Sequence, residues 1–244
     1  MTDYAISASS RDIDDLDRAA ALLPSAVRFV IALVGMAFEA RIAAGPGVFV
    51  ICRDGKNAVA ETFEAALQRG CRSIISFGVA GGLAPHLRAG DWIVGSSIID
   101  GQDARPTDTS WSQKMLSMIP GAQHAPIVGV DAAVADTNVK RQMHVRTGAA
   151  VVDMESHLVA RLASAYGLSF AAARVVIDPA HRQVPAAALA GLGPGGTNNV
   201  TAVIRELIAG PSQLFGLLRL ALDAYVARGA LLRMRRTLGP NFGL

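Results

Sequence analysis

Charged side chains of the sequence stand where buried strands are predicted to end. Glu39 follows the apolar run RFVIALV, and Arg174 and Asp178 lie in and directly after the apolar run SFAAARVVI. Asp153 and Glu155 flank the start of a further helical pattern. Carboxylates bind hydroxyl groups and transfer protons, and arginine binds anions. One such group alone is typical of a helix cap or a surface residue. With the glycine-rich segment 78–83 after the third strand, there are four such sites at successive strand ends. Together they indicate a ligand site, because ligands of open α/β sheets bind beyond the carboxyl ends of the strands.

A sheet covered by helices must position these groups. Short continuous apolar runs predict buried strands, and apolar residues at helical spacing predict the helices between them. We expect strands at 28–34, 47–52, 73–78, 91–99, 125–130 and 169–177, and helices at 57–69, 109–118, 137–146 and 154–166. Strands and helices alternate, which predicts an α/β fold: a three-layer α/β/α sandwich with a mixed, mostly parallel central sheet.

The sequence divides into three parts. Residues 1–25 form a polar lead-in that is a candidate for disorder, 26–210 form the main domain, and 211–244 form a basic carboxyl-terminal helix and tail. Within the domain, the stretch GLGPGG at 191–196 predicts a loop that is either a lid over the site or plain surface. Thr197 or Asn198 can cap the helix that follows it.

The carboxyl-terminal segment 212–236 is amphipathic and basic. Apolar residues fall at helical spacing, and five arginines stand against a single acid, Asp223. Such a helix can lie on an anionic membrane surface. The alternative interpretation is that it packs on the domain or on a second subunit with its arginines solvated.

Composition narrows the class of protein. The chain has 244 residues, of which 51% are hydrophobic and 18% charged, so it is long and apolar enough for a globular core. The net charge of +3 comes without a basic stripe interleaved with aromatics, so we expect no nucleic-acid partner. Cys52 and Cys71 form no metal-binding pattern and are expected to be reduced. We expect neither a signal peptide nor a membrane span, and therefore a cytoplasmic protein, with peripheral membrane contact through 212–236 as the open alternative.

Two segments resemble the signatures of the nucleoside phosphorylase and nucleosidase superfamily. GVAGGLAPHLRAGDWIV at 78–94 is similar to its G-x-A-G-G-L strand end and the G-D strand that follows. VVDMESHLVARLASAYGLSFAAARVVID at 151–178 is similar to its acidic-Met-Glu helix start and its arginine-bearing strand. Within the superfamily the sequence looks closest to methylthioadenosine/adenosylhomocysteine nucleosidases. More narrowly, the GMAFEAR segment and the basic tail resemble hopanoid-associated phosphorylases, which release adenine from adenosylhopane.

The resemblance implies a role for each matching position. The catalytic group would comprise Glu39, which orients and deprotonates water, Asp178, which protonates the purine at N7, and Arg174 near the nucleophile. Glu155 would hold the ribose hydroxyls, with Met154 beneath the sugar. The other residues expected to line the substrate site are Met36, Val79, Ala80, Gly81, Ala133, Val134 and Asp153.

Glycosidic C–N cleavage needs groups of this kind. The ribose becomes an oxocarbenium cation, which carboxylates stabilise, and the purine leaves more easily when an acid protonates it. Asp178 would need a raised pKa, which burial supplies. No metal or other cofactor is expected. The histidines, His181 included, form no metal-binding pattern either.

The sequence departs from the nucleosidases at three places. Val79 stands where they have a small hydroxyl residue, Ala133-Val134 where they have an aromatic that stacks on the base, and Ile177 where they have Ser. A pocket with more aliphatic groups would tolerate a bulky, lipid-like 5′ substituent.

We therefore expect an N-glycosyl hydrolase that releases adenine from a 5′-modified adenosine, a small nucleoside or an adenosylated lipid such as adenosylhopane. A phosphate-dependent phosphorylase is the first alternative: Glu39 would repel phosphate, but Arg41 and Arg174 could compensate. A non-catalytic nucleoside-binding protein is the second. The resemblance also implies a homodimer or a larger homo-oligomer.

Overall fold

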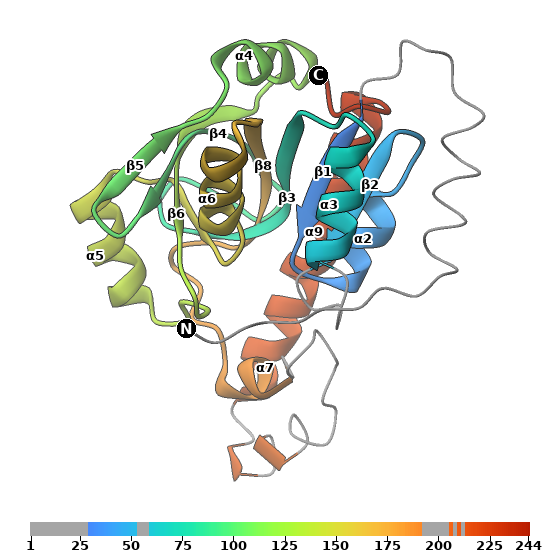
Figure 1. Cartoon of the computed structure of the whole chain (residues 1–244). Helices are drawn as coiled ribbons and strands as arrows, with labels where there is room; N and C mark the ends of the chain where they lie inside the picture. Colours follow the sequence, from blue (N-terminus) through green and yellow to red (C-terminus); the bar gives the residue numbers. More distant parts are fainter. Residues whose placement is uncertain (1–28, 53–58, 192–204, 207–208, 211–212) are drawn as a thin grey trace, which may run out of the picture.

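The computed structural model describes all residues except 1–28, 53–58, 192–204, 207–208 and 211–212 (Figure 1). The expected polar lead-in, most of the GLGPGG loop and the cap at Thr197 or Asn198 lie outside the described residues. Within them the chain forms one layered α/β structure (Figure 1).

The central sheet is mixed and mostly parallel, as predicted. Five of its strand pairings are parallel and three are antiparallel. The strands are β1 (Val30–Val34), β2 (Val48–Cys52), β3 (Ser73–Gly82), β4 (Trp92–Asp100), β5 (Asp103–Pro106), β6 (Gln123–Gly129), β7 (Val151–Asp153) and β8 (Ser169–Asp178).

Part of this sheet closes on itself. The path runs β2-β1-β3-β7-β6-β4-β5, and β8 pairs with both β3 and β4. The strands β3, β8, β4, β6 and β7 therefore form a closed ring. Parallel β1, β3 and β8 lie side by side, so their carboxyl ends meet at one edge, which is where the sequence places its charged groups.

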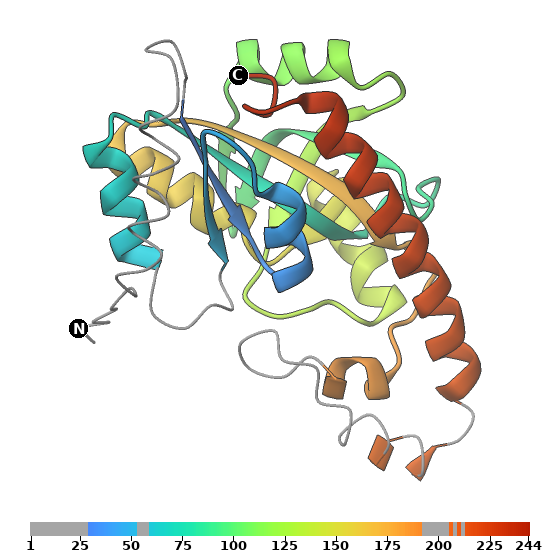
Figure 2. The ribbon, with the colours of Figure 1, turned by 90° about the vertical axis from the view of Figure 1, so that its right-hand side faces the viewer.

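Helices cover both faces of the sheet (Figures 1 and 2). Helices α3 (Val59–Gln68) and α6 (Ser156–Tyr166) pack on one face through a cluster that includes Phe63 and Val159. Helices α2 (Ala37–Ala43), α4 (Thr109–Met118) and α9 (Gln213–Leu238) contribute to the core on the other face. Helix α5 (Thr137–Thr147) lies between β6 and β7 in the chain, and α7 (Ala186–Gly191) follows the carboxyl end of β8.

The structure corrects the predicted elements at several points. The strand expected at 73–78 continues to Gly82, because Gly81 and Gly82 pair with β7 rather than turning. Strands β5 and β7 and helices α2 and α7 were not predicted. Each is short, and a segment of three to seven residues is too brief to show a hydrophobic period.

Helix α9 has two different halves. Its carboxyl-terminal half is packed against the sheet through buried residues such as Ala230, Leu231 and Met234. Its amino-terminal half extends past the body of the sheet (Figure 2) and exposes apolar side chains, among them Phe215 at 77% and Tyr225 at 78%. The packing interpretation of the tail therefore holds for one half of the helix.

Candidate active site

The carboxyl ends of β1, β3 and β8 bring together three carboxylates and one arginine. Glu39, Asp153, Glu155 and Arg174 are all buried, although they come from three separate parts of the chain: α2, the β7–α6 junction and β8. Residues 39 and 174 are far apart in sequence, so the pairing of β1, β3 and β8 is what makes them neighbours. The structure thus assembles four of the residues that the sequence singled out.

Glu39 lies at the third position of helix α2 and is only 1% exposed. Its Oε2 accepts the N–H groups of Gly35 and Met36 at 2.9 and 2.8 Å, and its Oε1 accepts the N–H of Val79 at 2.7 Å. A carboxylate at a helix amino terminus satisfies N–H groups that have no partner in the helix. Burial nevertheless raises the pKa of Glu39, against the opposing effects of Arg174 and these three hydrogen bonds.

Arg174 is fully buried at the centre of the cluster. Its Nε forms an ion pair with Asp153 Oδ2 at 2.6 Å, and its Nη2 lies 3.4 Å from Glu155 Oε2. Its Nη2 also donates to Ser76 Oγ at 2.5 Å. Burial disfavours the charged guanidinium, but the attraction of Asp153, Glu155 and Glu39 outweighs this effect and raises the pKa of Arg174.

Two glycines make room for this cluster. A Cβ at Gly35 would lie 2.6 Å from Glu155 Oε1. A Cβ at Gly78 would lie 2.3 Å from Glu39 Oε1 and 2.7 Å from Arg174 Nη1. Real side chains do not tolerate such distances, so at these two positions the backbone can approach the charged groups only where the residue is glycine.

Asp178 lies at the end of β8, four residues beyond Arg174 and so about 13 Å farther along the strand. A shift in the β3–β8 register between Ala80 and Gly81 sets Gly81 opposite Asp178. The carboxylate Oδ2 forms an ion pair of 2.5 Å with Lys140 Nζ of helix α5. Burial raises the pKa of Asp178, while the Lys140 ammonium opposes this effect.

The remaining predicted residues lie in the last part of β3 or in the segments that follow β1, β6 and β7. Met36 and Met154 are partly buried, and Val79, Ala80 and Gly81 lie near the carboxyl end of strand β3. Ala133 is exposed and Val134 is partly buried, both in the connection between β6 and α5. The N–H of Val184 donates to Ala135 O at 3.1 Å, which ties this connection to the segment after Asp178.

Sequence reasoning missed three polar residues that the structure adds to the site. Ser76 and Ser156 hold each other and Arg174 through their hydroxyl groups. Lys140 reaches Asp178 from a helix 38 residues earlier. The sequence around these three residues does not distinguish them from other polar residues. Their partners are either far away in the sequence or buried in the core, so the contacts cannot be recognised from neighbouring positions.

Arg41, which the sequence offered as a phosphate ligand, is exposed and donates to Ala37 O of its own helix at 3.3 Å. His181 is also exposed.

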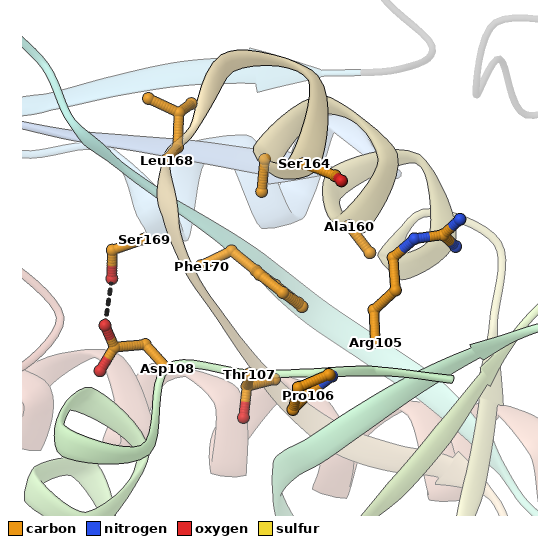
Figure 3. A pocket seen from close by; sticks show the side chains of 10 residues that line it. Arg105, Pro106, Thr107, Asp108, Ala160, Ser164, Leu168, Ser169 and Phe170 are labelled. Atoms are coloured by element: carbon orange, nitrogen blue, oxygen red, sulfur yellow. Dashed lines mark hydrogen bonds between the residues drawn. The ribbon is translucent and has the colours of Figure 1, made fainter. Parts of the chain in front are cut away.

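A pocket of about 420 Å³ lies elsewhere in the molecule (Figure 3). It is at the amino-terminal end of β8, the end opposite Asp178, and its lining includes Arg105, Thr107, Ser164 and Phe170. Polar groups there satisfy one another: Ser169 donates to Asp108 at 2.7 Å, and Asp108 caps helix α4 (Figure 3). The pocket is therefore separate from the cluster of strand-end charges.

No group of three or more His, Cys, Asp or Glu residues in the described part of the chain is arranged to hold a metal ion. Of the helices with described residues, none is both long and apolar enough to cross a membrane.

Comparisons with known proteins identify a matching family model. The family model described as "Phosphorylase superfamily" matches residues 11–209. A comparison with curated proteins found no match.

Solved structures with the same fold include two nucleosidases and a futalosine hydrolase. The futalosine hydrolase of Helicobacter pylori is 16% identical with a TM-score of 0.56, covering 85% of this chain and 97% of its own. A mutant of the Helicobacter pylori MTAN with 5′-methylthioadenosine in its active site is 14% identical, with a TM-score of 0.55 and coverage of 85% and 97%. The Arabidopsis thaliana 5′-methylthioadenosine nucleosidase is 14% identical, with a TM-score of 0.56 and coverage of 88% and 98%.

Proposed function

The chain belongs to the phosphorylase superfamily, and on that basis we propose that it hydrolyses the N-glycosidic bond of a purine nucleoside. The observation that carries the proposal is the buried group of Glu39, Glu155 and Arg174 at the ends of neighbouring strands. Such a group suits a reaction in which the sugar becomes cationic and water attacks it.

Glu39 is the base in this proposal. A carboxylate has about four acceptor positions, and backbone N–H groups occupy two on Oε2 and one on Oε1. Among the described residues, Val79 is the one donor to Oε1, which leaves a position there to accept a hydrogen bond from water. Because burial raises the pKa of Glu39, its carboxylate is also a stronger base than an exposed one.

Water fits the cluster better than phosphate does. The guanidinium of Arg174 is held by Asp153 and Glu155 and is fully buried, so it has no free face for an anion. With Glu39, three carboxylates surround this one buried cation. An incoming phosphate dianion would meet net negative charge, whereas a neutral water molecule would not. Glu155 and Asp153 also supply the negative charge that a cationic ribose needs.

Asp178 is the acid in this proposal. Its raised pKa favours the protonated form that can donate to purine N7. The Helicobacter pylori MTAN mutant observed with 5′-methylthioadenosine in its active site offers an adenine nucleoside as the substrate model. We accordingly propose that Asp178 protonates adenine as it leaves.

The 5′ substituent is proposed to be bulky and apolar, as in adenosylhopane. Val79 and Ile177 are aliphatic and belong to or pack against the apolar core on the α9 face of the sheet. The exposed half of α9 lies near the same end of β8: Arg182, shortly after Asp178, forms an ion pair of 2.7 Å with Asp223 of the helix. An apolar substituent leaving the site could continue along this surface.

The exposed half of α9 is proposed to contact an anionic membrane. Its exposed apolar residues are Leu214, Phe215, Leu218, Leu222, Tyr225 and Val226. The exposed arginines Arg219, Arg228, Arg233 and Arg236 flank this patch or continue along the helix. An apolar face bordered by cations is the pattern of helices that lie in a membrane interface. A second copy of the chain is the competing occupant.

Product analysis tests the proposed reaction. The purified protein is incubated with adenosine, methylthioadenosine, inosine and an adenosylated lipid, each with and without phosphate. Adenine release without phosphate is the expected result, with the adenosylated lipid preferred over the small nucleosides. Release only with phosphate, together with a ribose-1-phosphate product, would identify a phosphorylase. Binding without turnover of any of them would favour a nucleoside-binding protein.

A further inference from the structure

Lys140 is a buried charge for which the reaction described above has no use. It lies in helix α5, is 0% exposed, and forms the closest ion pair of Asp178. The residues beside it in the helix, Val139 and Arg141, are exposed. Only Lys140 and Met143 of the helix are buried, so a hydrophobic side chain at position 140 would serve the packing of α5 equally well.

The ammonium group of Lys140 is held by a complete set of acceptors. Nζ donates to Asp178 Oδ2 at 2.5 Å and to the carbonyl oxygens of Arg182 at 3.0 Å, Pro179 at 3.3 Å and Asp178 at 3.4 Å. A buried ammonium is tolerated only with such partners, because its desolvation costs several kcal/mol. One lysine thus fixes both the carboxylate of Asp178 and the backbone of the segment that follows it.

This arrangement gives the two carboxyl oxygens of Asp178 different roles. Oδ2 faces Lys140, so Oδ1 is the oxygen left for a ligand. If Oδ1 carries the proton, Lys140 donates to the carbonyl-like Oδ2 and holds the acid in one orientation. Once Oδ1–H has given its proton away, the same contact becomes a buried ion pair of ammonium and carboxylate.

We propose that Lys140 is a positioning residue that orients Asp178 and stabilises the carboxylate formed when Asp178 protonates the departing purine. The inference rests on the proposed nucleosidase function. In the step, the Oδ1–H bond of Asp178 breaks and an N7–H bond forms, while the electron pair of the glycosidic C–N bond passes to the purine. Water adds to the sugar carbon and gives a proton to Glu39, so one proton is lost and one is gained by the enzyme.

The pH dependence of the reaction follows from the charges around Asp178. They are Lys140 from α5, at 2.5 Å, and more weakly Asp223 from α9, which is itself paired with Arg182. Asp178 must be protonated, so turnover falls as pH rises through its pKa. The ammonium lowers this pKa against the effect of burial, so loss of Lys140 should raise it further. The descending limb of the pH profile should then move to higher pH while the maximal rate falls, because the carboxylate product is no longer stabilised.

The experiment compares Lys140→Met, Lys140→Gln and Lys140→Arg with the wild type. A matched control is Arg141→Met, which removes a cation from the exposed neighbouring position. The pH profile of kcat is measured on the best adenine nucleoside, and binding is measured with its 7-deaza analogue, which has no N7 to protonate. Thermal unfolding confirms that each variant is folded, and Lys140→Gln, which keeps hydrogen-bond donors without charge, serves if Lys140→Met does not fold.

We expect Lys140→Met and Lys140→Gln to lower maximal kcat about 100-fold, which is the smaller end of the usual contribution of general acid catalysis. The descending limbs of their pH profiles should move to higher pH by about one to three units, which is the usual effect of losing a nearby opposite charge. Lys140→Arg should retain the wild-type limb, and affinity for the 7-deaza analogue should stay within about threefold in every variant, because these binding contacts do not involve the proton.

Two different results would count against these ideas. If Lys140→Met and Lys140→Gln lose activity and analogue affinity together, with the limb in its wild-type position, Lys140 merely supports the structure and the inference is wrong. If the wild type releases no adenine while binding the analogue, the proposed function itself is overturned, and the inference with it.

Discussion

Replacing Arg174 with methionine should destabilise the protein in a pH-dependent way. The substitution keeps an unbranched side chain of similar length but removes the guanidinium that contacts Asp153 and Glu155. Breaking a buried ion pair from one side costs about 3–5 kcal/mol, because the partner charge stays buried without compensation. For a chain of this size, about 1 kcal/mol corresponds to roughly 2–4 °C in Tm. The expected loss is therefore roughly 6–20 °C near pH 8.

The buried carboxylates determine whether the loss of stability in Arg174→Met grows or shrinks as pH rises. Arg174 lowers the pKa of Glu39 against burial, so the variant raises that pKa further above its value in the unfolded chain. A carboxyl with a raised pKa in the folded state favours folding at low pH, and this advantage is lost as pH rises through the folded pKa. The loss in Tm should thus be smaller near pH 5, where the buried carboxylates can bind protons, than near pH 8.

Circular dichroism melts at both pH values measure this effect. Arg161→Met is the matched control, since Arg161 binds Asp100 through two short contacts of 2.6 and 2.7 Å but is exposed. Exposed ion pairs contribute little, so its Tm should barely change. An Arg174→Met protein that melts like the wild type at pH 8, or that loses more stability at pH 5 than at pH 8, would refute the reasoning from buried charge.

Four further predictions concern the site and the exposed helix. Asp178→Asn should lower adenine release about 10²- to 10⁴-fold while substrate still binds, as shown by product analysis and calorimetry; full turnover would remove Asp178 from the mechanism. Glu39→Gln should abolish the ascending limb of the pH profile, which in the wild type rises through the raised pKa of Glu39 as the carboxylate forms; a limb that persists would assign it to another group. Gly78→Ala should reduce both Tm and activity, because its Cβ would lie 2.3 Å from Glu39 Oε1, and unchanged values would contradict the tight packing of the site. The double substitution Phe215→Glu and Leu222→Glu should prevent the protein from sedimenting with anionic vesicles without affecting turnover of soluble adenosine. If the double variant changes from dimer to monomer and its vesicle binding is unchanged, this face is a subunit interface.

The main elements of the fold follow from local patterns in the sequence. Helix α4 occupies the predicted residues, and the first and last predicted strands differ from β1 and β8 by two residues or fewer at each end. Apolar runs of strand length and apolar residues at helical spacing are local properties, so they can be recognised without knowing how the rest of the chain folds. The prediction fails at the end of β3, where Gly81-Gly82 is typical of a turn but pairs with β7. Cross-strand contacts override the weak strand preference of glycine there.

The candidate site was predictable only in part. Charged residues after apolar runs mark strand ends, which is why Glu39, Glu155, Arg174 and Asp178 could be singled out. Lys140 could not be found this way, because one lysine in a polar helix has the same local pattern whether it faces water or the core.

The sequence by itself determined which elements form and which residues stand at the ends of the strands, because both depend on neighbours within a few positions. Only the tertiary structure decided which charges meet. The pairing of β1, β3 and β8 set Glu39 against Arg174, and the packing of α5 set Lys140 against Asp178. The energy of a charge depends on its burial and on the distance to its partners. Both are fixed by contacts between residues far apart in the chain, so the protonation of the site is a property of the folded protein.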